Sequence, residues 1–267
     1  MSGEELPQGL GQLLSIGGAG RVLDVDLPPG RLWVPKEHGG RFWMSDEPAT
    51  ADLWVGLHQA HPRSGLWPVF VNDRIGTPGR PWVTGVALPP PPVAIIDSLD
   101  ANAVLEDLWA ELIGDGEPDE EYLEMMEPFG RVWPGLAPAT DSRQDPDEFA
   151  DRYVRDKDDG MSLIMLVPVA RSADLITALR WLGPCNYRSN PPLSSVLRSW
   201  EDRFGARVVE IGTDVLNLAV AAPPVTAGHA EHVAAEHNAF CRDVVETIRE
   251  YAADAVLGKP NWSFWWD

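Results

Sequence analysis

The sequence predicts an α+β protein that combines mixed or antiparallel sheets with helices and ends in a β-α-α-β-β-α domain. Apolar residues recur at helical spacing from Leu193 to Phe204, and two apolar runs of strand length, ARVVEIG and VLNLAV, follow them. Hydrophobic residues make up 44% of the 267 residues, which is ordinary for a globular protein that buries a core of its own.

The first 92 residues are predicted to form a β-rich region with one main helix, from Thr50 to His61. Leu10 to Ile16 has the apolar spacing of a further, short helix. Three segments with alternating apolar residues, separated by Gly-rich and Pro-rich turns, indicate a small antiparallel sheet: RVLDVDL, RLWVP and RFWMS. The run GLWPVFV at 65–71 predicts a buried strand, and Pro89 to Pro92 should be extended.

Residues 93–158 are predicted to be a helical and acidic connecting region. Asp100 is suited to begin a helix with one apolar face, and Gly114 is suited to end it. The carboxylate-rich run that reaches Glu127 is expected to be a solvated loop, because it lacks the alternating ligand positions of an EF-hand calcium loop. Asp145 precedes a further predicted helix.

The C-terminal domain is assigned to residues 159–267. Its first strand should begin at Leu163, in the apolar run LIMLVPV. Ser172 or Asp174 is suited to cap the first helix, which carries leucines at helical spacing from Leu175 onward. These elements account for the first β and the first α of the predicted order.

The second half of this domain is expected to be a helix, a hairpin and a last helix. The helix that ends at Phe204 is followed by Gly205, which suits a left-handed stop. Gly212 to Asp214 reads as the hairpin turn between the two strands, and Pro223 and Pro224 should end the second strand. Thr226 is suited to cap a long helix that we expect to run towards Tyr251.

The final residues, NWSFWWD, alternate at the period of a strand. Trp262, Phe264 and Trp266 fall on one face, with Ser263 and Trp265 on the other. A free tail would expose several aromatic rings, which soluble proteins rarely tolerate. We therefore expect the tail to dock on the sheet; a partner-binding strand is the alternative.

Several strings in the C-terminal part resemble a known family. They are TALRWLGPCNY, SSVLRSWEDRFGARVVEIG, LNLAVAAPP, AAEHNAFC and WSFWWD. Together they resemble the actinobacterial family known as domain of unknown function 4253, over about residues 162–267, with weaker echoes in GLWPVFV and PFGRVWPGLAP. The sequence departs from the family pattern at Cys185, Asn238 and Arg242. Because the family has no established activity, the resemblance implies no catalytic residue.

The charge of the chain bears on its partners and compartment. The sequence carries 21 basic and 41 acidic residues, a net charge of −20, which repels phosphate backbones and anionic lipids. Nucleic acids and membranes are therefore disfavoured as partners, and a basic protein is favoured, although acidity also serves solubility. The absence of a long apolar run or a secretory signal pattern predicts a cytoplasmic protein, and two cysteines are no disulfide framework.

The histidines and the thiol of the last helix are the most suggestive chemical groups. His229 and His232 lie three residues apart, so a zinc or nickel site is one interpretation, but neither HExxH nor HxxEH is present. His237 and Cys241 are spaced to meet on one helix face, as a thiolate pair or, as we prefer, as buried core residues. No GxSxG, Walker or dinucleotide motif is found, and no cofactor or metal is predicted.

Two functional classes remain open from the sequence. The first is a non-enzymatic protein-binding module of a toxin-neutralising or regulatory kind, favoured by acidity, abundant tryptophan and missing catalytic motifs. The second is a small-molecule-binding domain or an unrecognised hydrolase. The residues that would form its site are Trp181, Asn186, Tyr187, Trp200, Glu236, His237 and Cys241.

Overall fold

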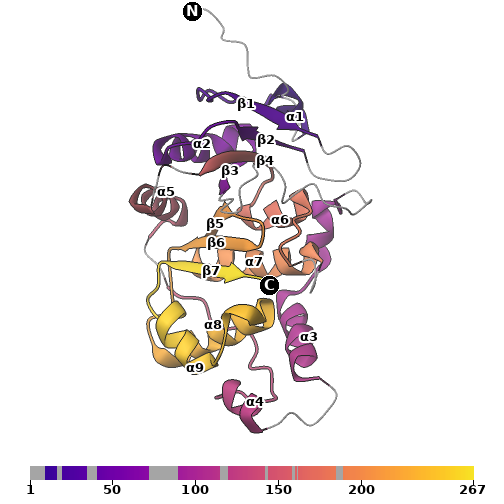
Figure 1. Ribbon diagram of the computed structural model, residues 1–267, viewed down its shortest axis with the longest axis vertical. Helices are drawn as coiled ribbons and strands as arrows, with labels where there is room; N and C mark the ends of the chain where they lie inside the picture. The colour runs from indigo at the N-terminus through magenta and orange to yellow at the C-terminus, as the bar shows by residue number, and fades with distance from the viewer. Residues whose placement is uncertain are drawn as a thin grey trace, which may run out of the picture.

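A seven-stranded sheet forms the centre of the protein, in the order β1-β2-β4-β3-β5-β6-β7 (Figure 1). The computed structural model describes residues 10–16, 20–34, 41–71, 90–114, 120–141, 144–157, 160, 162–184 and 189–267. The strands are β1 Gly30–Trp33, β2 Phe42–Ser45, β3 Leu66–Val71, β4 Leu163–Pro168, β5 Ala206–Ile211, β6 Val215–Val220 and β7 Asn261–Trp265. Neighbouring strands are antiparallel except β3 and β5, which are parallel, so the predicted α+β class with a mixed sheet is confirmed.

Helices cover both faces of this sheet. They are α1 Leu10–Ile16, α2 Ala51–Ser64, α3 Ala101–Ile113, α4 Glu120–Met125, α5 Pro146–Lys157, α6 Leu175–Leu179, α7 Asn190–Phe204, α8 Ala227–Phe240 and α9 Ile248–Tyr251. Short 3₁₀ turns are η1 Val93–Ser98, η2 Ser172–Asp174 and η3 Arg242–Val244, and Ala252–Val256 forms a π-helical turn, η4. The predicted order of the C-terminal domain is confirmed, and β7 is added to it.

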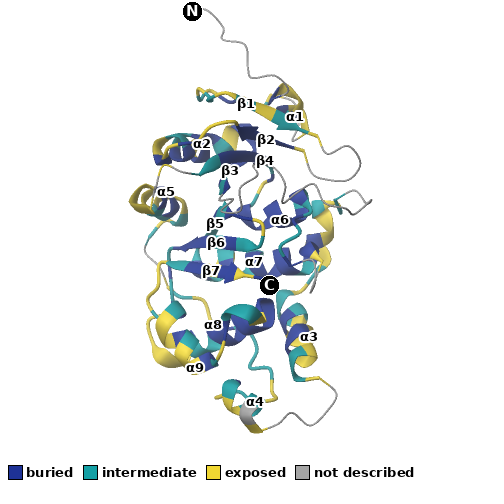
Figure 2. Cartoon of the chain, in the orientation of Figure 1, coloured by how far each residue is buried: buried dark blue, intermediate teal, exposed yellow. Residues whose placement is uncertain are grey.

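Successive side chains of a strand point to opposite faces, and two cores result. The larger core lies between the sheet and α3, α7 and α8, and it holds most of the aromatic residues. The smaller core lies under α1, α2 and α5, around Trp43 and Trp54. Figure 2 shows that buried residues concentrate in the strands and on the helix sides that face them.

Predicted capping residues mark several helix ends. The Thr50 hydroxyl accepts a hydrogen bond from the Leu53 amide (3.3 Å) at the start of α2, and Asp100 accepts one from the Ala103 amide (2.8 Å) at the start of α3. Gly205 ends α7 with φ of 60°, and a Cβ there would lie 2.9 Å from a side-chain carbon of Pro146. Glycine is therefore required at this turn for both its backbone angle and its size.

The strand prediction for RVLDVDL is wrong. Residues 21–27 are irregular, although Leu23 is buried against the smaller core. The segment is held beside α2 by the Val22 amide, which donates to the Arg63 carbonyl (3.4 Å), and by the ion pair of Arg63 with Asp24 (2.7 Å). The apolar alternation therefore reflects contacts with a helix, not strand pairing.

Part of the acidic run also differs from the expectation of a loop. Residues 120–125 form α4, while residues 115–119 lie outside the described part of the chain. Tyr122 anchors this short helix, since its hydroxyl donates to the Leu112 carbonyl (3.0 Å) at the end of α3. A single tertiary contact of this kind is invisible in local composition.

The expected single helix from Thr226 to Tyr251 is interrupted. Thr226 is the N-cap of α8, as predicted, but α8 ends at Phe240, and Cys241 has the non-helical angles φ −149° and ψ 89°. Thr247 then caps α9, accepting from the Glu250 amide (3.3 Å). The break allows the chain to fold back so that the Cys241 thiol donates to the Trp265 carbonyl of β7 (3.0 Å).

The C-terminal tail docks as predicted. It forms β7, which pairs with β6 along its whole length. Trp262, Phe264 and Trp266 are 1%, 0% and 3% exposed, whereas Trp265 on the opposite face is 43% exposed. The alternation read from the sequence therefore corresponds to one core-facing row and one open row.

Replacing Trp262 by alanine should cost about 3–5 kcal/mol of unfolding free energy, because the indole is fully buried between α7, α8 and the sheet. Trp265→Ala is the matched control and should change stability by less than about 1 kcal/mol. Urea unfolding followed by tryptophan fluorescence and circular dichroism measures both. Equal losses for the two variants would show that β7 is not inserted as described.

Candidate functional site

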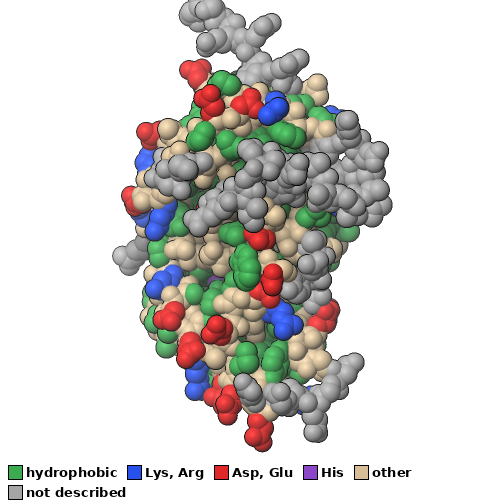
Figure 3. Space-filling model, in the orientation of Figure 1, with side chains coloured by type: hydrophobic (Ala, Val, Ile, Leu, Met, Phe, Trp, Pro, Cys, Tyr) green, Lys and Arg blue, Asp and Glu red, His purple; other side chains and the backbone are tan. Residues whose placement is uncertain are grey.

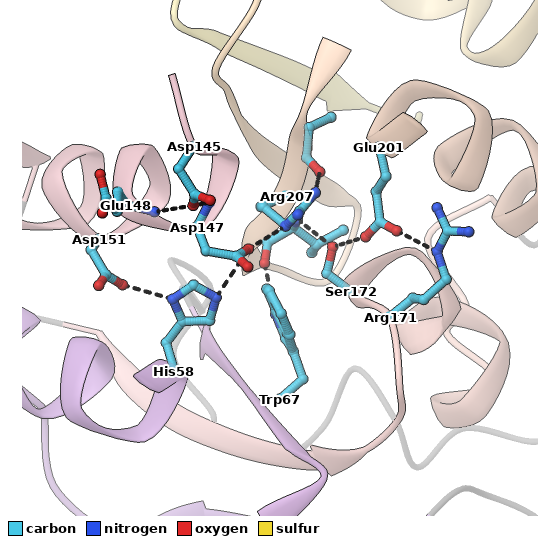
Figure 4. A network of polar contacts seen from close by, with 12 residues as sticks. His58, Trp67, Asp145, Asp147, Glu148, Asp151, Arg171, Ser172, Glu201 and Arg207 are labelled. Atoms are coloured by element: carbon cyan, nitrogen blue, oxygen red, sulfur yellow. Dashed lines mark hydrogen bonds and ion pairs between the residues drawn. The ribbon is translucent and has the colours of Figure 1, made fainter. Parts of the chain in front are cut away.

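A polar cavity of about 280 Å³ lies where β4 ends and β5 begins. Its wall combines residues of the N-terminal half with residues of the C-terminal domain (Figure 4). The charged and polar residues that line it are His61, Asp147, Arg171, Ser172, Glu201, Asp202 and Arg207, with Trp67 beside them. None of these residues belongs to the ligand set predicted from the sequence, because they are dispersed over α2, β3, α5, α7, β5 and the β4–α6 connection.

The carboxylate of Glu201 lies at the centre of a hydrogen-bond network on one side of this cavity. It accepts hydrogen bonds from the Ser172 hydroxyl, the Ala173 amide (3.0 Å) and the Arg171 Nε (2.7 Å). The Ser172 oxygen in turn accepts from the Val208 amide (3.0 Å). The Ser172 hydroxyl thus donates a hydrogen bond to a carboxylate and accepts one from a backbone amide. It is therefore not arranged as a nucleophile activated by a histidine.

Two arginines complete this side of the cavity as fixed ion pairs. Arg171 also donates to Asp202 (2.6 Å) and to the Arg198 carbonyl (3.1 Å). Arg207, at the start of β5, pairs with Asp147 at the start of α5 (2.7 Å). Because each guanidinium is paired with a carboxylate of the chain, the cavity does not form an open anion site.

His58 lies behind the cavity and joins α2 to α5. It is 5% exposed, and its Nδ1 lies 2.6 Å from Asp151 while its Nε2 lies 3.7 Å from Asp147. Burial by itself lowers the pKa of His58, but the contacts with Asp147 and Asp151 outweigh burial and raise the pKa above 6.5. Conversely, His58 and Arg207 lower the pKa of Asp147. A cationic ring between two carboxylates is therefore the favoured state.

His61 lies one helical turn further along α2 and has the opposite character. Its Nε2 lies 2.8 Å from the Val169 carbonyl, which fits a neutral ring donating from that nitrogen. Burial lowers the pKa of His61, and the backbone hydrogen bond only partly opposes this effect. Trp67 packs edge-on against both histidines, with ring centroids 4.8 Å from His58 and 5.1 Å from His61.

Three members of the predicted ligand set, Trp181, Trp200 and His237, lie in one buried aromatic cluster. Trp200 contacts His237 (centroids 4.9 Å apart) and Phe240 (4.8 Å), and Phe240 contacts Trp266 (5.6 Å), which contacts Trp181 (5.3 Å). The structure thus brings Trp181, Trp200 and His237 into one continuous network. Asn186 and Tyr187 lie outside the described residues, as does Cys185.

His237 and Cys241 are buried as predicted, but their side chains make separate hydrogen bonds. The His237 Nδ1 lies 3.1 Å from the Tyr251 hydroxyl, whereas the Cys241 thiol donates to the backbone of β7. Burial holds the pKa of His237 well below 6.5 and raises the pKa of Cys241 to about 12. A neutral imidazole and a protonated thiol are the favoured states, and both are unsuited to thiolate catalysis.

Glu236 is the residue of the predicted set with the clearest role. Its side chain is fully buried, and its Oε1 accepts from the Ala137 amide (2.7 Å) and from Arg203 (2.7 Å). Its Oε2 accepts from the Trp200 indole (2.7 Å) and from the second Arg203 nitrogen (2.6 Å). All four positions are used within the protein, so Glu236 is a structural anion and not an open ligand-binding group.

The paired histidines of α8 serve the packing of the segment that precedes α5. His229 Nε2 lies 2.8 Å from the Pro138 carbonyl, and His232 Nε2 lies 3.1 Å from the Pro134 carbonyl. Across the described residues, no group of three or more His, Cys, Asp or Glu side chains is placed to hold a metal ion.

Glu236→Gln should lower the free energy of unfolding by about 3–5 kcal/mol, because it leaves Arg203 in the core without a counter-charge. Glu231→Gln, on the more exposed part of the same helix, is the matched control and should cost less than about 0.5 kcal/mol. Chemical denaturation at neutral pH measures both. Similar small losses would contradict the role assigned to Glu236.

The two histidines of α2 should titrate with opposite effects on stability. Since the folded pKa of His58 is raised, its contribution is full below 6.5 and is lost as the pH rises through the folded value. Since the folded pKa of His61 is lowered, its contribution is full above 6.5 and is lost as the pH falls. The stability difference between the native protein and His58→Asn should therefore shrink as the pH rises above about 6.5, while that for His61→Asn should shrink as the pH falls below about 6.5. Parallel slopes would contradict the assignment.

No helix within the described ranges is both long and apolar enough to cross a membrane.

Comparison with known proteins gives a match to one family model. No curated protein and no solved structure matches the chain. Residues 163–267, which begin with β4 and include the larger part of the cavity wall, match the model of a family described as domain of unknown function (DUF4253).

Proposed function

We propose that the chain is a non-catalytic module that binds a positively charged protein partner in the cytoplasm, in a toxin-neutralising or regulatory role. The observation that carries the proposal is the distribution of charge. Eight arginines of the described structure are paired with the chain's own carboxylates, while the full sequence carries 41 acidic against 21 basic residues. These arginines are Arg31, Arg63, Arg155, Arg171, Arg198, Arg203, Arg207 and Arg249.

Many carboxylates of the described residues are exposed. Figure 3 shows acidic side chains spread over the end of the molecule formed by α4, α8 and α9. Exposed carboxylates of this region include Glu120, Glu124, Glu246, Glu250 and Asp254. A surface of this kind repels nucleic acids and anionic membranes, and it raises the association rate of a cationic protein.

The chemistry of the interior supports a non-catalytic role. Three groups with catalytic potential are bonded within the protein: the Ser172 hydroxyl bonds Glu201, the His58 imidazole lies between two aspartates, and the Cys241 thiol bonds the backbone. An acyl-transfer site needs a nucleophile, a base within reach and donors for the developing oxyanion. Ser172, His58 and Cys241 instead form hydrogen bonds and ion pairs that link helices and strands.

The small-molecule alternative has one structural feature in its favour, the polar cavity beside His61. Its lining includes Asp147, Glu201, Asp202, Arg171 and Arg207, so the formal charges of these five residues nearly balance. A small dipolar molecule fits such a lining better than a simple anion or cation does. Binding of such a molecule is the second candidate function. Unlike the binding of a basic protein, it should not depend on the total charge of the chain.

Binding should depend strongly on salt if the first proposal holds. A lysine-rich peptide should bind the protein and a glutamate-rich peptide of equal length should not. Raising the salt from about 0.1 M to about 1 M shortens the Debye length from about 10 Å to about 3 Å. The affinity of the protein for the lysine peptide should then fall by at least about tenfold. Fluorescence anisotropy measures this. Salt-independent binding, or equal binding of both peptides, would contradict electrostatic recognition.

A further inference from the structure

Among the described residues, the outer edge of the sheet at β7 has backbone groups without hydrogen-bond partners. The Trp266 amide donates to the Asp214 carbonyl (3.0 Å), which fixes the residues of β7 that face β6. Along an antiparallel strand, the N–H and C=O groups of successive residues point alternately toward and away from the neighbouring strand. The backbone groups of Asn261, Ser263 and Trp265 therefore point away from β6.

Only one end of this edge is covered by other parts of the described structure. The Cys241 thiol donates to the Trp265 carbonyl (3.0 Å), and Asp243 accepts from the Asp267 amide (3.2 Å). The segment around η3 therefore covers the C-terminal end of the edge. Among the described residues, no hydrogen bond is made to the outward backbone groups of Ser263, and its side chain is exposed. An unpaired edge of this kind is a template for an added strand.

The face of β7 opposite the large core is also open. The Trp265 ring is 43% exposed and is the one aromatic among the exposed large hydrophobic residues of the described structure. Its indole nitrogen donates to Asp214 (3.3 Å), which holds the ring against the hairpin turn. On the neighbouring strands of this face, α5 packs over β5 and β6, and Asn217 donates to Glu210 (2.8 Å).

Charge identifies the kind of segment that this edge suits. Asp214 and Asp243 flank the strand through their hydrogen bonds to it, and the exposed Asp267 follows it. Lys259 and Arg242 are the cations of the adjoining described segments, so acidic groups outnumber basic ones there. A second copy of this chain would bring another net charge of −20 to the same edge, which disfavours pairing between copies.

We propose that the free edge of β7, with the Trp265 ring beside it, accepts an extended and positively charged segment of a protein partner as an additional strand. Main-chain hydrogen bonds to Ser263 and Asn261 hold the segment, and its lysine or arginine side chains contact the Trp265 ring and the flanking carboxylates. This inference rests on the proposed function, because it locates the basic partner on the surface.

Ser263→Pro tests the edge directly. The Ser263 amide points away from β6, so proline there removes no hydrogen bond of the native sheet but blocks strand addition. Ser263→Ala is the matched control. Ser263→Lys leaves the backbone intact and opposes a cationic segment, so it keeps the test decisive should the proline variant misfold. The probe is a peptide of about eight alternating lysine and threonine residues, long enough for one strand.

The proline and lysine variants should each bind this peptide at least about tenfold more weakly, corresponding to about 1.4 kcal/mol, and the alanine variant should bind like the native protein. Peptide addition should also slow hydrogen exchange at the Ser263 amide, measured by NMR. Unchanged binding by both Ser263→Pro and Ser263→Lys would overturn the inference.

Variants at a second acidic surface distinguish failure of the β7 inference from failure of the proposed function. The hollow around α4 is lined by Glu120, Glu124 and Glu127 beside Leu123 and Phe129. If the double variant Glu120→Gln, Glu124→Gln weakens the peptide while the Ser263 variants do not, the basic partner binds elsewhere and only the β7 inference fails. If the native protein binds no lysine peptide at low salt, the proposed function fails as well.

Discussion

A single buried carboxylate, that of Glu236, holds the helical layer of the C-terminal domain together. It is fully buried, and it is neutralised by Arg203 and bonded by Trp200, both on α7, and by the Ala137 amide of the segment before α5. An unpaired carboxylate in such a place would cost several kcal/mol, so α8, α7 and this segment must adopt one mutual arrangement. The aromatic cluster around Trp200 and His237 then packs in the space which that arrangement defines.

Comparable ties join the two halves of the chain on the other side of the sheet. β3, from the first 92 residues, lies between β4 and β5 of the family-matched region, and Arg207 reaches Asp147 of α5. His58 and Trp67 continue this contact into α2 and β3. Residues 163–267 alone would therefore lack the strand that connects their own β4 to β5. The internal ion pairs therefore hold the two halves of the chain together.

The parts of the fold that the sequence predicted are those set by local rules. Periodicity placed α7, glycine geometry placed its end at Gly205, and strand alternation placed β7. Turn composition placed the β5–β6 hairpin, with Gly212 to Asp214 between the strands. Each of these features depends on residues within a few positions of one another, where backbone preferences and side-chain alternation are decisive.

The remaining features depend on contacts between distant residues. The break at Cys241 occurs where its thiol bonds the distant Trp265 carbonyl, and the irregular segment of Leu23 lies against α2. The cavity was missed because Ser172, Glu201 and Asp147 come from separate elements and carry no common motif. Glu236 was included in the predicted site, but its four donors, which define its role, come from α7 and from Ala137.

The most direct test of the central claim, that the interior charges are structural and the surface carboxylates bind a partner, is native mass spectrometry of the tagged protein isolated from its own host. The spectra should show a stoichiometric complex with a protein of net positive charge, which dissociates as the salt is raised to about 1 M and the Debye length falls to about 3 Å. A bound small molecule that survives the same salt, with no cationic protein at any ionic strength, would contradict the account.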